Sequence, residues 1–326
     1  MTIEMRLFGA TIVALLIGLV VGPLILPVLR RLKIQQTIRE EGPASHLKKG
    51  GTPTMGGIIF LLTLIITVFI FVPVAELDIA VTWLWLVLGL GVVGFLDDYI
   101  KVVRKQSLGL RAREKLLGQM LVAVVFYGML KYFGHSQDVI VPIFGWRLAL
   151  DWLYLPFIIV LTMAAGNGAN LTDGVDGLLA STVVVACLAY VVIGLATGVE
   201  VVAVLSAALL GSMLAFLRFN WHPAAVFMGD VGSLALGGAL AGAAVITKTE
   251  LLLIPIGIMF VIETLSLIIQ VIYFRKTGGK RFFRMAPIHH HFELSGWSEV
   301  KIVFAWCLLG VVGGIVGLLL LPSMGF

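Results

Sequence analysis

Charged residues are scarce in this chain, and cysteine is nearly absent. Only 13% of the 326 residues are Asp, Glu, Lys or Arg, whereas 60% are hydrophobic. Soluble globular domains are about one quarter charged, so this composition excludes that class. The two cysteines, Cys187 and Cys307, both lie in apolar stretches. We therefore interpret them as packing residues rather than as a disulfide or a metal site.

Long apolar runs take the place of the missing charge. A run of about 20 apolar residues can cross the hydrocarbon core of a bilayer as a helix, and runs of this length are too long for barrel strands. We therefore predict an all-α integral membrane protein, with residues 1–326 forming a single polytopic domain. Ten such runs lie near residues 9–29, 54–72, 80–96, 116–133, 152–168, 178–197, 200–217, 232–247, 250–274 and 302–321.

The basic residues are distributed unevenly between the two sets of connecting loops. If the ten runs alternate across a membrane, 19 of the 23 Lys and Arg residues fall on one side. Basic residues accumulate on the cytoplasmic side of membrane proteins. This side is therefore predicted to be cytoplasmic, and both termini are predicted to be periplasmic or extracellular. The net charge of +5 reflects this bias and does not indicate binding to nucleic acid.

One predicted outer connection is longer than the others. In residues 134–151, apolar and polar side chains alternate on either side of Gly145, which predicts a small hairpin. Glycine is also frequent within the apolar runs, with 37 residues in the chain. We interpret these glycines as sites of close helix packing rather than as a cradle for a cofactor.

The carboxylates and histidines gather in four segments at the predicted cytoplasmic ends of the helices. The segments are residues 95–99, 170–177, 227–231 and 287–293. Together they hold five Asp and three His residues. Such a gathering at one water-facing end of an apolar chain is typical of the reaction centre of an enzyme.

An ion or proton transporter is the main alternative from another functional class. Transporter sites usually lie near the middle of the membrane, on broken helices. In this chain only Glu263 is predicted to be central. A carboxylate inside the membrane is a functional candidate by default. We nevertheless interpret Glu263 as a protonated or hydrogen-bonded packing residue and leave it out of the predicted site.

Asp97 and Asp98 end the third predicted helix. Lys101 lies one turn beyond Asp97, so these two side chains share a helix face and can pair. Adjacent carboxylates repel one another, which suits a proton acceptor or a divalent-metal site. The alternative is a solvated helix end that is neutralised by the nearby basic residues.

A second polar pattern occupies residues 166–177. Asn167, Asn170, Asp173 and Asp176 recur at every third position, which would place their polar groups roughly on one side of a helical turn. The segment contains no Lys or Arg. An acidic cluster without basic partners favours a cation, either a metal ion or Mg²⁺ bound to a substrate. A plain turn would need only one or two of these residues.

Asp230 and three consecutive histidines complete the set of candidate site residues. Asp230 follows Gly229 at the predicted start of the eighth helix, where its alternative role is a helix N-cap. The histidines from His289 to His291 titrate near neutrality, which suits phosphate donors or acid–base groups. The basic residues in the preceding loop, residues 275–284, complement a polyphosphate or lipid headgroups.

Together these segments resemble MraY, the phospho-N-acetylmuramoyl-pentapeptide transferase family of bacterial cell-wall synthesis. The blocks at 97–101, 170–177 and 227–233 are shared with the wider polyprenyl-phosphate sugar-1-phosphate transferase superfamily. The His-His-His-Phe-Glu block within residues 287–293 points to MraY itself. A further block lies at 48–57, and the match runs in order from about residue 30 to about residue 300.

The resemblance implies a reaction and its partners. We expect ten helices around a cytoplasmic cleft, in the inner (plasma) membrane of a bacterium. The cleft would bind UDP-N-acetylmuramoyl-pentapeptide, and undecaprenyl phosphate would enter from the bilayer. The products would be lipid I and UMP, Mg²⁺ would be required, and a homodimer is expected by analogy.

The resemblance also implies residue roles. Asp97 would be the base that acts on the lipid phosphate, with Asp98 beside it, and Asp230 would hold Mg²⁺. Lys101 and His289 would contact the substrate phosphates or the leaving group. The implied substrate-binding residues are Lys49, Thr54, Lys115, Asn167, Asn170, Asp173, Asp176, Asn220, Phe227, Gln270, His290 and His291.

Two alternatives lie close to this reading. A sister enzyme would transfer N-acetylhexosamine-1-phosphate to the same lipid, although the three histidines argue against it. A rival mechanism would use an Asp as the nucleophile and form a phospho-enzyme. We favour direct attack, because the lipid phosphate is already a competent anion and one open cleft can hold both substrates.

Overall fold

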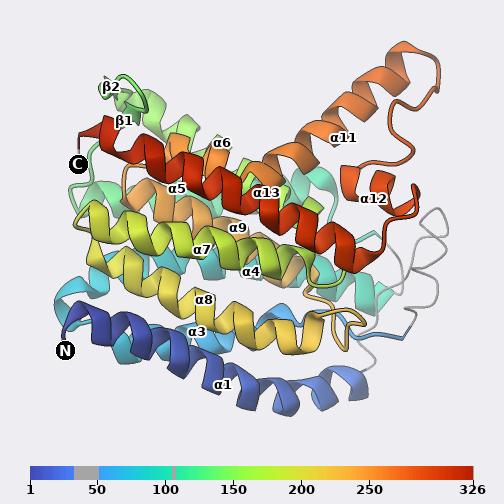
Figure 1. Ribbon diagram of the computed structural model, residues 1–326, viewed down its shortest axis with the longest axis horizontal. Helices are drawn as coiled ribbons and strands as arrows, with labels where there is room; N and C mark the ends of the chain where they lie inside the picture. The colour runs from blue at the N-terminus through green and yellow to red at the C-terminus, as the bar shows by residue number, and fades with distance from the viewer. Residues whose placement is uncertain (33–50, 105–107, 326) are drawn as a thin grey trace.

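The computed structural model describes residues 1–32, 51–104 and 108–325, and helices dominate these parts of the chain (Figure 1). The long helices are α1 (Ile3–Arg31), α3 (Gly57–Phe71), α4 (Leu77–Arg104), α5 (Ala112–Tyr132), α6 (Tyr154–Thr172), α7 (Leu178–Ala196), α8 (Glu200–Asn220), α9 (Gly229–Ile246), α11 (Ile258–Lys276) and α13 (Glu299–Leu320). The shorter elements are α10 (Leu253–Ile256), α12 (Ile288–Glu293), four single 3₁₀ turns at Val74–Glu76, Asp151–Leu153, Glu250–Leu252 and Leu321–Met324, and the strands β1 (Asp138–Val141) and β2 (Trp146–Ala149).

The helices coincide with the apolar runs of the sequence. Within the described residues, eight helical segments are long and apolar enough to cross a membrane, and α3 is a shorter apolar helix of 15 residues. Each of the ten predicted runs corresponds to a helix, except that the ninth is divided at Gly257 into α10 and α11. The predicted all-α membrane protein is therefore confirmed as a class.

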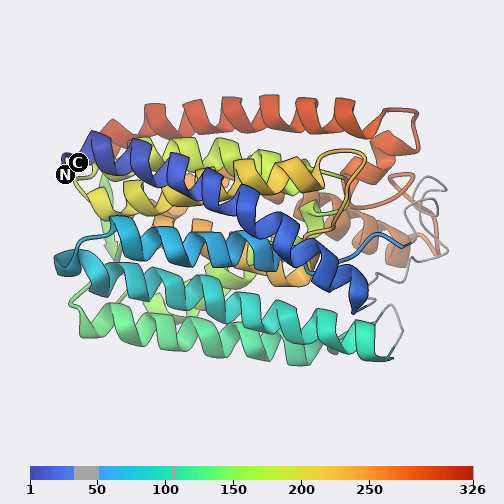
Figure 2. The same cartoon turned by 90° about the horizontal axis from the view of Figure 1, so that it is seen from below.

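The helices form an elongated bundle with two different ends. Both termini and the β1–β2 hairpin lie at one end, and α12 lies at the other (Figures 1 and 2). α11 diverges from the bundle and extends away from its neighbours towards the end that carries α12 (Figure 1). The four segments predicted to form the site lie in or next to α4, α6, α9 and α12, near this second end.

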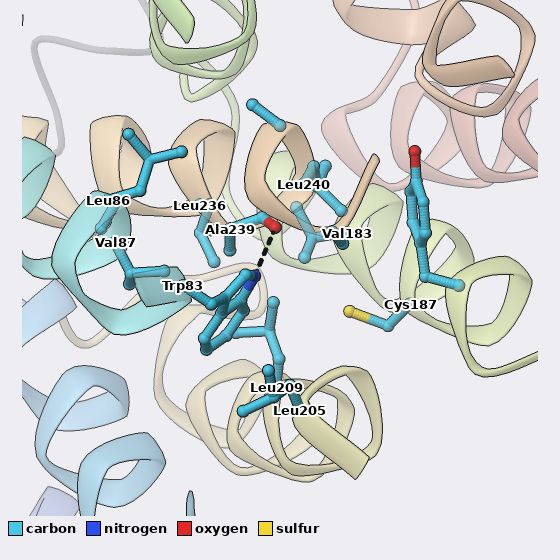
Figure 3. Close-up of a cluster of buried hydrophobic side chains, with 14 of the residues drawn as sticks. Trp83, Leu86, Val87, Val183, Cys187, Leu205, Leu209, Leu236, Ala239 and Leu240 are labelled. Carbon is cyan, nitrogen blue, oxygen red and sulfur yellow. Dashed lines mark hydrogen bonds between the residues drawn. The ribbon is translucent and has the colours of Figure 1, made fainter. Parts of the chain in front are cut away.

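α9 lies at the centre of the bundle and is its most buried membrane-length helix. It packs along α4, where the Trp83 indole donates a hydrogen bond of 2.8 Å to the Ala239 carbonyl (Figure 3). Glycine permits this close approach, because a methyl group at position 94 would lie only 2.0 Å from the Asp230 carbonyl oxygen. The packing interpretation of the glycines therefore holds here, and it brings the end of α4 against the start of α9.

The predicted hairpin is confirmed. β1 and β2 are antiparallel, with Val139 opposite Leu148 and Ile140 opposite Arg147. Val139 and Ile140 are buried against the bundle, whereas β2 is exposed. The buried Lys248 ammonium donates to the Asp138 carbonyl at 2.9 Å, which attaches the hairpin to the end of α9.

Candidate active site

Three carboxylates from two helices form the centre of the candidate site. Asp97 and Asp98 lie near the end of α4, and Asp230 lies in the first turn of α9. One carboxylate oxygen from each residue lies within 4.8 Å of the other two. Asp97 and Asp98 are each only 3% exposed. The two carboxylates are therefore not solvated, and the alternative interpretation of the pair as a solvated helix end is wrong; α4 itself continues to Arg104.

Backbone groups hold two of these carboxylates in place. The Leu110 amide donates to Asp97 Oδ1 at 2.9 Å, and the Val231 amide donates to Asp98 Oδ2 at 3.1 Å. Asp230 does not cap α9, because the N-cap residue is Met228 and it makes no side-chain cap. The N-cap alternative for Asp230 is therefore wrong, and its carboxylate is available for side-chain partners.

Two lysines neutralise most of the negative charge. The Lys101 ammonium lies 2.6 Å from Asp97 Oδ2, 3.5 Å from Asp98 Oδ1 and 3.1 Å from Asp230 Oδ2. Lys115, from α5, lies 2.8 Å from the same Asp230 oxygen. The predicted contact between Asp97 and Lys101 is confirmed. Three carboxylates against two ammonium groups leave one formal negative charge, which favours an additional cation.

α6 contributes amide groups to the same centre. The Asn170 amide donates to Asp230 Oδ1 and to the Ser233 hydroxyl, each at 2.8 Å. Lys115 also donates to the side-chain oxygen of Asn170, Oδ1, at 3.4 Å. Asn167, one turn earlier, instead exchanges two hydrogen bonds with Gln119, of 2.8 and 3.3 Å. Asn170 therefore belongs to the carboxylate centre, whereas Asn167 joins α6 to α5.

The predicted single polar face of residues 167–176 is wrong. α6 ends at Thr172, with Asp173 as its C-cap, and Asp176 follows in a turn. This Asp-Gly-Val-Asp-Gly stretch is rich in residues that favour turns, and Gly177 completes it at a φ of +75°. A three-residue spacing continues one face only while the chain remains helical, so the spacing loses its meaning after residue 172.

Asp173 lies beside the carboxylate centre. Desolvation of its carboxyl group, and next the negative charges of Asp230 and Asp98, raise the Asp173 pKa well above its usual value. The raised pKa favours the protonated form of this carboxyl group, which can donate a hydrogen bond as well as accept one.

A tight turn before α9 holds the surrounding residues together. Gly229 has a φ of +75°, and a methyl group there would lie 2.5 Å from Asp98 Oδ2 and 2.9 Å from the Thr54 hydroxyl. Only glycine accepts both the backbone angle and the crowding.

Thr54 and Phe227 lie on two segments that pair through their backbones. The Phe227 amide donates to the Pro53 carbonyl at 2.8 Å, and the Gly56 amide donates to the Phe227 carbonyl at 2.9 Å. Thr54 is 5% exposed and Phe227 is half-buried. Lys49, which was predicted to bind substrate, lies outside the described residues.

Asp176 and Asn220 form a second polar group that joins three loops. Asp176 Oδ2 accepts from the Ala224 amide at 3.0 Å and lies 3.1 Å from His222 Nδ1. Glu299 Oε2 accepts from the Asp176 amide at 3.1 Å and lies 3.6 Å from His222 Nδ1. Asn220 accepts from the Gly177 amide at 3.1 Å. Sequence reasoning missed the roles of His222 and Glu299, because neither lies in a recognisable motif.

The three histidines have three different environments. His289 is fully buried, and its Nδ1 lies 3.0 Å from Glu263 Oε2. His290 Nδ1 lies 3.2 Å from Glu293 Oε2, and His291 Nδ1 accepts from the Arg284 amide at 3.1 Å. The histidine block is therefore not one uniform phosphate-binding surface.

Gln270 and Glu263 extend this region along α11. Oε1 of the Gln270 side chain accepts from the amides of Phe282 and Phe283, at 3.1 and 2.9 Å, and so holds the basic loop. Glu263, interpreted from the sequence as a protonated or hydrogen-bonded packing residue, is hydrogen-bonded as expected, by the Trp306 indole at 2.6 Å. Its carboxyl group also lies 3.0 Å from Nδ1 of His289, which belongs to the predicted site. The position of Glu263 in the middle of an apolar helix was the sequence feature that could have placed it among the predicted site residues.

An apolar groove of about 230 Å³ lies beside the site helices. It is lined by α6, α9, α10 and α11, including Leu161, Leu240, Phe260 and Leu265. Glu250 is the one charged residue in its lining. A groove of this chemistry suits a hydrocarbon chain rather than a polar ligand.

Comparison with known proteins identifies the family. Residues 80–248 match the model of glycosyl transferase family 4. The chain is 49% identical to the phospho-N-acetylmuramoyl-pentapeptide-transferase of Halalkalibacterium halodurans, over 95% of this chain and 96% of that protein. It is 50% identical to the protein of the same name from Geobacillus kaustophilus, over 97% and 98%. For the Bacillus subtilis protein the identity is 45%, over 97% and 98%. This chain belongs to the phospho-N-acetylmuramoyl-pentapeptide-transferase family.

Proposed function

We propose that this protein transfers phospho-N-acetylmuramoyl-pentapeptide from UDP-N-acetylmuramoyl-pentapeptide to undecaprenyl phosphate. The products are lipid I and UMP, and the reaction is the first membrane step of peptidoglycan synthesis. The names of the full-length relatives support this reaction. The observation that carries the proposal is the cluster of Asp97, Asp98 and Asp230 with Lys101 and Lys115, because phosphoryl transfer needs aligned groups that manage negative charge.

In the proposed mechanism Asp97 acts on the lipid phosphate. Its Oδ1 is used by the Leu110 amide, so Oδ2, which faces Lys101, is the atom that takes the proton. A phosphate oxygen of the lipid then attacks the sugar-side phosphorus of the pyrophosphate. The bond from this phosphorus to the bridging oxygen breaks, and UMP leaves. Lys101 and Lys115 balance the charge that collects on the phosphate oxygens.

The carboxylate cluster fits Mg²⁺. This ion prefers oxygen ligands and is commonly held by one or two carboxylates together with substrate phosphates. We assign the ion to Asp230, with Asp97 and Asp98 close enough to assist. When bound, the ion supplies neutralisation of the pyrophosphate charge.

The remaining site residues are proposed to bind the nucleotide-sugar. Asn170 and Asp173 adjoin the carboxylate centre, and Phe227 can stack on the uracil ring. Asp176 and Asn220 hold the loops around that pocket. The other members of the proposed binding surface are Lys49, Thr54, Asn167, Gln270, His289, His290 and His291.

The proposed topology completes this picture. α3 and α5, added to the eight membrane-length segments, would make ten spans in one membrane domain. With both termini outside, the site faces the cytoplasm of a bacterial inner membrane. The apolar groove beside α11 supports an isoprenoid substrate. A homodimer is proposed by family analogy, and no nucleic-acid partner is proposed.

The test is UMP release by the purified protein with undecaprenyl phosphate and Mg²⁺. Release from UDP-N-acetylmuramoyl-pentapeptide alone, lost with EDTA, supports the proposal. Release from UDP-N-acetylglucosamine alone would favour the sister enzyme that transfers N-acetylhexosamine-1-phosphate. If the folded protein releases UMP from neither donor, the ion-coupled transporter becomes the better hypothesis.

A second measurement separates the two mechanisms. With nucleotide-sugar alone, an Asp nucleophile would leave a labelled phospho-enzyme, whereas direct attack leaves none. We expect no trapped intermediate, because both substrates must be present for direct transfer.

A further inference from the structure

Glu263 forms a buried polar chain with two other residues inside an apolar part of the bundle. Its Oε1 accepts a 2.6 Å hydrogen bond from the Trp306 indole of α13. Its Oε2 lies 3.0 Å from His289 Nδ1 of α12. Glu263 and His289 are both fully buried. Three consecutive elements, α11, α12 and α13, therefore meet at this one carboxylate.

The contact constrains the proton on His289. When Glu263 is ionised, its carboxylate can only accept a hydrogen bond, so the His289 nitrogen that faces it is then the one that carries a proton. Nδ1 lies 3.0 Å from the Glu263 carboxyl oxygen, although the two groups are not aligned for a hydrogen bond in this structure. The second ring nitrogen, Nε2, is buried and has no hydrogen-bond partner among the described residues.

The free nitrogen faces the loop between α6 and α7. A methyl group at Gly174 would lie 2.2 Å from His289 Nε2, so the ring lies directly against the backbone of this loop. The loop also carries Asp173 and Asp176. The orientation of His289 is thus linked to residues on both sides of the proposed nucleotide-sugar pocket.

We propose that Glu263 is the positioning residue of His289, keeping Nδ1 protonated and presenting Nε2 to the Gly174 loop. This inference rests on the proposed function, in which His289 contacts substrate phosphates. Trp306 supports the arrangement by holding the far oxygen of the carboxylate. A positioned imidazole of this kind meets a phosphate without first having to reorient.

The first test is a kinetic double-mutant cycle. Glu263→Gln keeps the shape of the side chain but removes its charge, and its single acceptor oxygen cannot serve both the Trp306 indole and His289 Nδ1. We expect kcat/KM for UMP release to fall by about 10- to 100-fold, as for loss of a hydrogen bond to a charged group. In a His289→Asn background the same substitution should change kcat/KM less than about twofold, because its effect passes through the ring.

If the two substitutions lower kcat/KM independently, so that their effects multiply in the Glu263→Gln, His289→Asn double variant, the proposal is overturned. A His289→Asn variant with undiminished kcat/KM would also overturn it. If Glu263→Gln does not fold, Trp306→Phe supplies the same cycle, since it removes the indole donor and retains an aromatic ring. Glu200→Gln is the matched control, because it removes a carboxylate that pairs with Arg6 at the opposite end of the bundle.

The second test does not depend on activity. In protein labelled with ¹⁵N-histidine, the His289 resonances are those that disappear in His289→Asn. We expect Nδ1 to be protonated in the unmodified protein and unprotonated in Glu263→Gln. An unprotonated Nδ1 in the unmodified protein would overturn the inference. Because this signal needs no substrate, it remains decisive even if the assay for the proposed function fails.

Discussion

The two ends of the bundle both bury charge, but they do so in different ways. At the end with the termini, the Lys248 ammonium donates to the Asp138 carbonyl at 2.9 Å and to the Tyr154 hydroxyl at 3.2 Å, and it also contacts the Ser136 carbonyl. At the other end, Lys101 faces three carboxylates. The first lysine has neutral oxygens for all three of its protons, with the single Asp138 carboxylate a further 3.5 Å contact, whereas the second lies among three carboxylates and balances their charge.

This difference separates structural from chemical use of the same residue type. A buried ammonium that is satisfied by backbone carbonyls stabilises one arrangement of the chain. A cluster in which carboxylates outnumber ammonium groups retains a formal charge that a substrate or metal ion can change. Burial of charge alone therefore does not identify a site, and the identity of the partners does.

The largest expected effect is at the carboxylate end. Asp97→Asn should lower kcat for UMP release by about 10²- to 10⁴-fold, because the variant lacks the proposed proton acceptor. Thermal unfolding in detergent should show a folded protein. A fully active Asp97→Asn enzyme would contradict the proposed chemical role of the carboxylate cluster. The cluster would then be structural, like the group of residues around Lys248.

A steric change between α4 and α9 should damage both stability and activity. Gly94→Ala places a methyl group 2.0 Å from the Asp230 carbonyl, so the helices must move apart. We expect a loss of about 1–3 kcal/mol in the free energy of unfolding, as for an overpacked core. The fall in kcat should exceed that of Gly128→Ala, where the added methyl group meets no atom within 4 Å.

A substitution at the end of the bundle that carries the termini should lower stability without affecting catalysis. Lys248→Met removes a 9% exposed ammonium and leaves carbonyls without their donor. We expect a loss of about 2 kcal/mol in unfolding free energy, measured by thermal and denaturant unfolding. UMP release per folded molecule should be unchanged. A specific loss of activity would show that the two ends communicate.

The smallest effect is a pH dependence at the same end. Burial, and next the positive charge of Lys248, lower the pKa of His135 to about 4 from a usual value of about 6.5. Between these values the unfolded chain binds a proton that the folded chain does not, so stability falls as the pH drops from 6.5 to 4. His135→Gln should make the unfolding temperature less sensitive to pH across this window. An equally steep dependence in the variant would exclude His135 as its source.

Periodicity and composition were sufficient to predict the helices. Each apolar run became a helix, since a run of that length in lipid has no other way to satisfy its backbone. The break at Gly257 was not predicted, because the residues on both sides are equally apolar. The hairpin was predicted, since alternation around Gly145 is a local signal.

Only part of the candidate site was predicted correctly from the sequence. The Asp97–Lys101 pair follows from helix geometry alone and was confirmed. The face shared by residues 167–176 was wrong, because α6 ends at Thr172 and spacing is informative only within an element. The partnership of Glu263 with His289 joins residues 26 positions apart in different elements, and spacing cannot reveal it.

By itself, the sequence determined the membrane class, the positions of the helices, the family resemblance and the set of residues that carry charge. Those properties depend on local composition, on the length of apolar runs and on motifs that are continuous in the chain. Only the tertiary structure decided that Asp230 meets Asp97 and Asp98, that Asp176 joins His222 and Glu299, and that Lys248 is satisfied by carbonyls. These contacts depend on how closely α4 and α9 approach and on where each helix ends, and both are set by packing across the whole bundle.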